Sequence, residues 1–482
     1  MHVPLTGSVL RSLTLHTTVF ATLLAGSGCA SLDASHELQA TAEAARRITG
    51  SIDPAEAWSL SVEGESPAWN GRQPLSYDDA VAVSLQGDPR IRRSLAVIVE
   101  RRAWYVQEGL PPNPTVAFGI GIAVDGLSGA PLMIQGLQML SWLWKNPHRV
   151  AAAEAELRAA VYDAAFLCVD LMARTRMQVA AVLAAQQVLD YDRQYADITN
   201  RTLKLIQAQV DVGELPRLEL DRAVLDYQEA MEGVIAGEHA LEQSKLELLA
   251  TMGRPTASTD WRATGDLPPR WNVPTDEQAL LDLAATGRLD VASAREAVLQ
   301  IQAELGLAET RKFPEIGVGL DFKRSFSGRK GITPGMSITV PILDNGDPAV
   351  AIQSARLDAA LMDLLATIEL AQSSVRISLN QYQDARDRTR IIRDHQFQAA
   401  VSAQERSDAA YREGVIDLNT LLMTQRQRIT VERNLVMQEL MTMNAMCELR
   451  MAVGGSFDPT LDAVEPIEIE ARSPATQEED AS

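Results

Sequence analysis

Two long stretches of the chain keep a helical spacing of apolar residues and contain neither glycine nor proline. The first covers residues 148–212 and the second covers residues 349–413, so each is 65 residues long. A proline precedes each stretch, and a glycine follows it. Ordinary globular helices have about 10–14 residues. Runs of this length therefore predict extended coiled-coil helices packed side by side, not a compact core.

The apolar positions in both stretches are spaced alternately four and three residues apart, as in a coiled-coil seam. The first seam consists of Leu157, Val161, Ala164, Cys168 and Leu171, and the second consists of Leu357, Leu361, Leu364, Ile368 and Ala371. Corresponding positions lie 200 residues apart. This offset indicates an internal duplication of one long unit.

Upstream of each long stretch the apolar period changes from 3.6 to 2, which is typical of strands. The alternating apolar positions are Val116, Phe118 and Ile120 in the first unit and Ile316, Val318, Leu320 and Phe322 in the second. In each unit a turn and a second strand follow, so one β-hairpin is predicted per unit. Each strand is expected to have about 10 residues, the length that a tilted strand needs to cross a bilayer.

A hairpin lying on a soluble core is the alternative, and a single hairpin would favour it. Two matched hairpins, each leading into a 65-residue helix, favour membrane strands whose alternating apolar residues face lipid. Trp142 and Trp144, at the end of the first hairpin, fit an interfacial aromatic belt. Four strands cannot close a barrel, because the smallest membrane barrels have about 8, and an open edge in lipid is prohibitive. Several chains are therefore expected to share one barrel.

Further helices precede the hairpins and follow the long stretches. One is expected from Ser76 towards Gly109 and another from Thr275 to about Lys312. Return helices are expected to end near Met252 and Val453, and each follows a tight turn that contains glycine. The two turns contain Val212, Gly213 and Glu214 in the first unit and Glu413, Gly414 and Val415 in the second, where Asp417 is expected to cap the return helix.

The two predicted repeats cover residues 74–262 and 263–455. Residues 1–28 resemble an export signal, residues 29–73 form a tether with one short helix near residues 37–47, and residues 456–482 are an acidic tail expected to be disordered. Cys29 follows small residues, as at a bacterial lipoprotein processing site, although Gly26 stands where that signal usually has Leu. Lipidation of Cys29 and simple cleavage nearby are the two interpretations.

The composition and the motifs argue against several classes of function. With 44 basic and 64 acidic residues the net charge is −20, which argues against a nucleic-acid partner. The six histidines form no pair at metal-ligand spacing, and no phosphate loop or nucleophile elbow is present. The remaining cysteines, Cys168 and Cys447, lie within helical patterns and are interpreted as small buried residues. We therefore predict no enzyme activity, no metal and no cofactor.

The duplicated order of helix, hairpin, long helix, turn and return helix resembles the TolC-type outer membrane efflux family over about residues 74–455. Residues 411–415 (YREGV) and 421–426 (LLMTQR) add to the resemblance. It implies a mainly helical chain that forms a homotrimer, with a shared 12-stranded barrel in the outer membrane and an α-barrel across the periplasm. It also implies that the turns dock onto a periplasmic adaptor protein, which an inner membrane pump serves.

The family places its narrowest point near the turn of the second unit. Related channels often carry Asp where this chain has Met423, so a carboxylate gate at Met423 itself is excluded. The nearest acid is Asp417, and Arg426 is a candidate tie to a neighbouring helix. In a trimer Asp417 would form a ring of three carboxylates; alternatively, it only caps its helix.

The resemblance implies a passive export channel whose cargo is selected mostly by the pump. Members of this family export metal ions, drugs, dyes and secreted peptides. An exported structural coiled-coil protein of the cell envelope is the alternative, and it would explain the long helices but would leave the two hairpins without a role.

Overall fold

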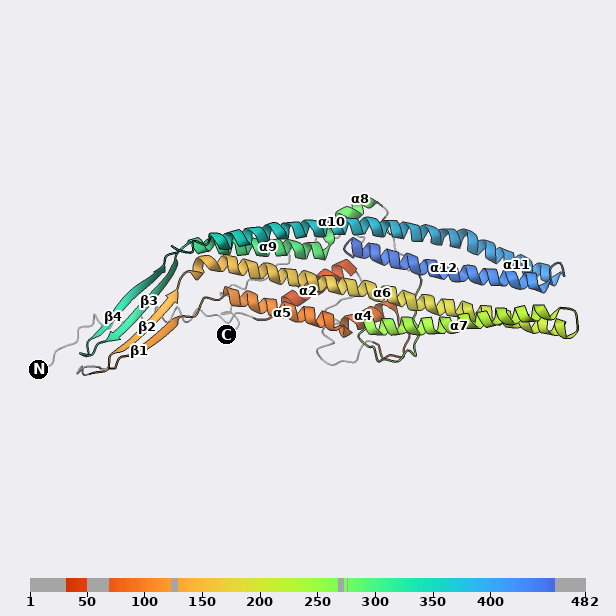
Figure 1. The fold of residues 1–482 in the computed structure, drawn as a ribbon, viewed down its shortest axis with the longest axis horizontal. Helices are drawn as coiled ribbons and strands as arrows, with labels where there is room; N and C mark the ends of the chain where they lie inside the picture. Colours follow the sequence, from red (N-terminus) through yellow and green to blue (C-terminus); the bar gives the residue numbers. More distant parts are fainter. Residues whose placement is uncertain (1–31, 50–68, 123–128, 268–272, 275, 456–482) are drawn as a thin grey trace, which may run out of the picture.

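The chain is a long, narrow molecule with a β-sheet at one end and two helical hairpins at the other (Figure 1). The computed structural model describes residues 32–49, 69–122, 129–267, 273–274 and 276–455, and every element given below lies within these ranges. Cys29 and the acidic tail at 456–482 lie outside them.

The helix predicted from Ser76 to Gly109 is in fact two helices, α4 (Tyr77–Gly87) and α5 (Pro89–Gly109). The break follows from Asp88 and Pro89, because a residue before proline is pushed out of the helical region. Asp88 is extended, with φ −74° and ψ 118°. At the start of α4, where the sequence predicted a helix to begin, Ser76 and Asp79 form a capping box.

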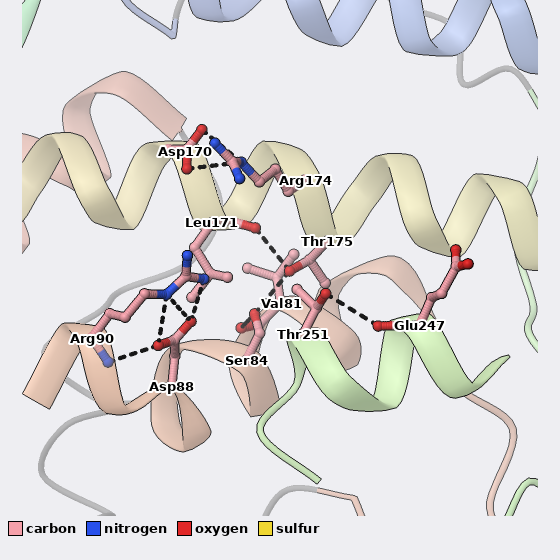
Figure 2. Close-up of polar contacts among 10 residues, drawn as sticks. All are labelled: Val81, Ser84, Asp88, Arg90, Asp170, Leu171, Arg174, Thr175, Glu247 and Thr251. Atoms are coloured by element: carbon pink, nitrogen blue, oxygen red, sulfur yellow. Dashed lines mark hydrogen bonds and ion pairs between the residues drawn. The ribbon is translucent and has the colours of Figure 1, made fainter. Parts of the chain in front are cut away.

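Asp88 holds the start of α5 through its side chain, as Figure 2 shows. Its carboxylate accepts a hydrogen bond from the Arg90 backbone N–H at 2.7 Å and pairs with the Arg90 guanidinium at 2.7 Å. Burial opposes ionisation of Asp88, but the hydrogen bonds from Arg90 outweigh it and lower the pKa of the carboxyl. One turn away, the hydroxyls of Ser84 and Thr175 lie 3.1 Å apart and join α4 to the long helix behind it.

The second unit has the same break. The predicted helix from Thr275 to Lys312 is divided into α8 (Glu277–Gly287) and α9 (Leu289–Glu309), followed by a 3₁₀ turn, η1 (Thr310–Lys312). Like their counterparts α4 and α5, these helices have 11 and 21 residues. Here no proline marks the break, and Arg288 supplies the extended residue with φ −80° and ψ 127°.

Glycine at the end of each short helix permits contact with a return helix. A Cβ atom on Gly87 would lie 2.4 Å from the Met252 carbonyl oxygen, and one on Gly253 would lie 2.5 Å from the Gly87 oxygen. In the second unit a Cβ on Gly454 would lie 2.8 Å from the Gly287 oxygen. Two backbones therefore touch at the same place in each unit, which only glycine allows.

The long helices extend beyond the predicted stretches. The first, α6 (Trp142–Asp211), has 70 residues and begins six residues before residue 148, with Pro147 inside it. Trp142 and Trp144 are therefore its first turn and not the end of the hairpin. The second consists of α10 (Asp347–Ile391), a π-helical turn, η2 (Ile392–Phe397), and α11 (Gln398–Arg412).

The π-helical turn distinguishes the two long helices. It lies in the second, while α6 continues without interruption through the corresponding residues. Such turns insert a residue into a helix and bend it. In Figure 1 the blue segment from α10 to α11 curves towards the far end of the molecule.

The return helices are α7 (Arg217–Thr251) and α12 (Leu418–Ala452), and both end where the sequence indicated. Helix α6 packs against α5, α7, α9 and α12, so it is the central element of the chain. The buried side chains that join these helices are concentrated midway along the molecule. The tether contributes one helix, α2 (Ser35–Thr49), which packs on α5 and α6 and buries an ion pair between Glu37 and Arg102 at 3.0 Å.

The two hairpins form one antiparallel sheet in the order β1-β2-β3-β4. The strands are β1 (Thr115–Ile120), β2 (Leu132–Met139), β3 (Glu315–Arg324) and β4 (Lys330–Thr339). The strands of the second unit have the predicted length of ten residues, but β1 and β2 have only six and eight. Strands β1 and β4 are the two edges of the sheet.

The register places the alternating apolar residues of β1, β3 and β4 on one face, together with Leu132 and Ile134 of β2. Phe118 pairs with Ile134, Ile134 with Phe322, and Phe322 with Ile332. This apolar face is solvent-exposed in the single chain, and the side chain of Phe118 is 73% exposed. The other face of β3 and β4 carries small or polar residues, among them Gly317, Asp321 and Ser337.

Neither cysteine offers chemistry at the surface. Cys168 and Cys447 are free thiols buried among the helices, and burial raises their pKa to about 12 and about 11. Among the described helices, none combines the length and hydropathy of a membrane-spanning segment.

Candidate functional site

Both helical turns lie at the end of the molecule furthest from the sheet (Figure 1). Both are built in the same way. Glu214 N–H donates to the Gln209 carbonyl at 2.9 Å, and Val415 N–H donates to the Ala410 carbonyl at 2.8 Å. The residue before each donor is glycine with positive φ, 80° for Gly213 and 72° for Gly414. This arrangement is the Schellman cap, which requires a left-handed residue to end a helix.

The turns are open to solvent. All six predicted docking residues are exposed, and Val212 and Val415 are each 71% exposed. A Cβ atom on Gly213 or Gly414 would meet no atom within 4 Å. Each turn therefore presents an apolar side chain next to a patch of bare backbone, which a partner could approach closely.

Asp417 caps α12, as the sequence indicated. Its carboxylate accepts a hydrogen bond from the Thr420 backbone N–H at 2.9 Å. Hydrogen bonds from Thr420 hold the pKa of this carboxyl below its ordinary value. The Asp417 side chain therefore points back onto its own helix.

Arg426 links the two helical hairpins. Its guanidinium donates to the carboxylate of Asp226 on α7 at 2.9 Å and lies 5.8 Å from the ring centre of Tyr195 on α6. Met423, one turn nearer the end of the molecule, is 62% exposed. The three predicted entrance residues therefore have different roles in the structure. Asp417 caps α12, Met423 is an exposed side chain, and Arg426 joins the two helical hairpins.

The comparison with known families matches residues 280–455 to the outer membrane efflux protein family. This segment contains α9 to α12, both strands of the second hairpin and the second turn. It also contains residues 411–415 and 421–426, the two short motifs that added to the resemblance.

The chain is therefore similar to the TolC-type outer membrane efflux protein family.

Solved structures extend the likeness to most of the length of the chain. A membrane protein from Pseudomonas aeruginosa superimposes with a TM-score of 0.66 at 19% identity over 79% of this chain and 90% of that chain. The CmeC outer membrane channel of Campylobacter jejuni gives 0.66 at 14% identity over 80% and 86%. The outer membrane protein VceC of Vibrio cholerae gives 0.64 at 16% identity over 79% and 97%. At these identities the likeness establishes the fold. No curated protein sequence matches the chain.

One contact between the two helical hairpins was not predicted from the sequence. Asp192 on α6 is 3% exposed and lies 3.1 Å from Arg433 on α12. Burial raises the pKa of Asp192, and the charge of Arg433 opposes that rise. The sequence does contain a signal for this contact. Asp192 occupies a position of the four-three apolar pattern, between Leu189 and Ala196, and a buried acid at such a position needs a partner of opposite charge.

The described part of the chain holds no cluster of three or more potential metal ligands among its His, Cys, Asp and Glu residues. The surfaces with a functional interpretation are therefore the apolar face of the sheet, the two turns and the segment between Asp417 and Arg426.

Proposed function

We propose that the chain is the outer membrane channel of a tripartite export system. It conducts cargo passively from a periplasmic adaptor protein and an inner membrane pump to the outside. The observation that carries this proposal is the exposed apolar face of a sheet whose edges, β1 and β4, are open. A structural coiled-coil protein would have no use for that face.

The open edges favour a homotrimer with a shared barrel. Backbone N–H and C=O groups at a sheet edge must be paired in lipid, because the bilayer core offers no water. Pairing of β4 in one copy with β1 in the next satisfies both edges, and three copies supply twelve strands. The matched lengths of α4 and α8, and of α5 and α9, support the duplicated unit whose six copies would line the periplasmic α-barrel.

The direct test is the oligomeric state in the outer membrane. We expect outer membrane fractions to contain a heat-modifiable band at about three times the 52.5 kDa of one chain, because closed barrels resist detergent until heated. The purified trimer should form conducting pores in planar bilayers. A soluble, non-conducting rod would contradict the proposal and support the structural alternative.

The two turns are proposed as the surface that receives the adaptor. Their exposed valines and bare glycine backbones lie at the end furthest from the barrel, where a periplasmic partner would meet them (Figure 1). Lipidation of Cys29 would anchor the tether in the same membrane as the barrel. Helix α2 begins at Ser35, so little chain separates that anchor from the helices.

The entrance is proposed to be an apolar constriction formed by Met423 from each copy. Asp417 supports this assignment because its carboxylate is already engaged with Thr420. Arg426 holds α12 against the first hairpin through Asp226, so it would limit how far the second hairpin moves away from the axis.

Asp417→Asn is expected to leave single-channel conductance and block by divalent cations unchanged. The amide oxygen can still accept the Thr420 N–H, so the cap is kept while the charge is removed. Planar bilayer recordings with and without divalent cations measure both quantities. Weaker cation block in Asp417→Asn would instead assign Asp417 to a ring of three carboxylates. Asp417→Ala, which removes the cap as well, is the control for loss of the helix start.

A further inference from the structure

The far end of the apolar face carries an unusual pair of charges. Arg324, the last residue of β3, lies directly opposite Lys330, the first residue of β4. By the register of the sheet both belong to the same face as Phe322 and Ile332. Like charges directly opposite each other on neighbouring strands destabilise a hairpin. We call Arg324 and Lys330 the rim pair.

No carboxylate compensates the rim pair within the described part of the chain. Both side chains are exposed, and neither forms an ion pair or a side-chain hydrogen bond with another described residue. The neighbouring Lys323, by contrast, lies on the opposite face of β3 and has Asp321 at 3.8 Å. Arg329 adds a further cation beside the pair. The charge on the apolar side of the sheet therefore lacks an internal counter-ion among these residues.

The position of the rim pair along the strand agrees with the edge of a bilayer. Ile316 and Arg324 mark the two ends of the alternating face of β3. The eight steps between these two residues, at about 3.4 Å each, give about 27 Å along the strand. A tilt of about 40° reduces this to about 21 Å across the membrane, close to the apolar band of about 25 Å in known barrels. The rim pair would thus lie where lipid headgroups begin.

We propose that the rim pair binds the phosphate groups of anionic lipid in the outer leaflet. This inference rests on the proposed membrane barrel. A phosphate between Arg324 and Lys330 would replace their mutual repulsion with charge-assisted hydrogen bonds, and Arg can bind it with two parallel N–H groups. The acyl chains of the same lipid would cover the adjoining apolar side chains of Phe322 and Ile332. Twofold-charged phosphate monoesters fit the pair better than singly charged diesters do.

The test measures lipid binding to the intact trimer by native mass spectrometry, with diphosphoryl lipid A as the probe. We expect wild type to bind this lipid more tightly than phosphatidylglycerol, and phosphatidylethanolamine weakly. In Arg324→Gln/Lys330→Gln the affinity for diphosphoryl lipid A should fall at least about tenfold. Lys323→Gln removes one charge from the same hairpin on the opposite face, so it should bind like wild type.

A second variant separates loss of lipid binding from loss of the β3–β4 hairpin. Lys330→Glu converts the repulsive pair into an attractive one, so lipid binding should fall while the temperature of trimer dissociation in detergent holds or rises. Unchanged affinity in both rim variants, equal loss in Lys323→Gln, or complete displacement of the lipid by excess inorganic phosphate would overturn the lipid assignment. Conductance of the same preparations separates the two proposals. Normal pores without this lipid preference overturn only the rim site, whereas absence of trimers and pores in wild type overturns the proposed function as well.

Discussion

Val318→Arg is expected to abolish assembly of the trimer in the outer membrane. Val318 lies in the middle of β3, on the apolar face, opposite Met336 of β4. An arginine facing lipid near the midplane costs about 2–4 kcal/mol in each chain. Three copies share one barrel, so the total cost is about 6–12 kcal/mol, which is comparable to the whole stability of a typical domain. The heat-modifiable trimer band in membrane fractions provides the measurement.

The matched control for Val318→Arg is Ser337→Arg. Ser337 follows Met336 in β4 and so lies at nearly the same depth, but on the opposite face of the sheet. An arginine there would face the water-filled interior and should be tolerated in the assembled trimer. If both variants assemble as well as wild type, or if Ser337→Arg is the damaging one, the assignment of the lipid face is wrong.

Gly414→Trp is expected to abolish export and to leave the trimer and its membrane insertion intact. The bare backbone of Gly414 adjoins the exposed side chain of Val415, and a Cβ atom added to Gly414 would have no neighbour within 4 Å. An indole at this turn would therefore not clash within the chain, but it would block the approach of an adaptor backbone. Export of a co-expressed pump's substrate and adaptor cross-linking measure the effect.

Gly414→Ala separates docking from folding. The φ of Gly414 is 72°, so any side chain at this position costs about 1–2 kcal/mol of backbone strain. Alanine introduces the same strain as tryptophan with little bulk, and we expect it to retain most export. If both variants lose the trimer, the role of Gly414 is to end α11 and not to receive an adaptor.

The long helices and hairpins were predictable because their signals are local. Sixty-five residues without glycine or proline and with a four-three apolar pattern leave the backbone one regular conformation. The same holds for Ile316 to Phe322, whose period of two specifies both the strand and the residues that share its apolar face. The turns were predictable because Gly213 and Gly414 occupy the left-handed positions that end helices.

The errors arose where a local rule competes with packing. Pro147 predicted the start of a helix, yet α6 begins at Trp142. Pro147 is the sixth residue of α6, beyond the first four N–H groups that have no partner within a helix, so it removes one hydrogen bond to the Leu143 carbonyl that packing of the helix must offset. The Lys145 side chain meanwhile pairs with Glu315 at 2.5 Å, a contact between residues far apart in the sequence.

The break at Arg288 is a second example of a feature decided by tertiary contact. Nothing next to Arg288 forbids a helix, as Pro89 does in the first unit. Its guanidinium, however, donates to the Ala452 carbonyl at 3.0 Å and to Ser374 at 3.2 Å. The chain is therefore bent where α8, α10 and α12 meet, and no single segment carries that information.

The sequence by itself determined the order of elements, the two faces of the sheet, the turns and the absence of enzyme motifs. Each depends on periods or turn residues within a few neighbouring positions. Only the tertiary structure decided the helix breaks, the π-helical turn, the tie between Arg426 and Asp226, and the opposition of Arg324 and Lys330. These features depend on the register and packing of segments that are distant in the sequence. For the charged residues, the free energy is set by the neighbours that folding brings close to them.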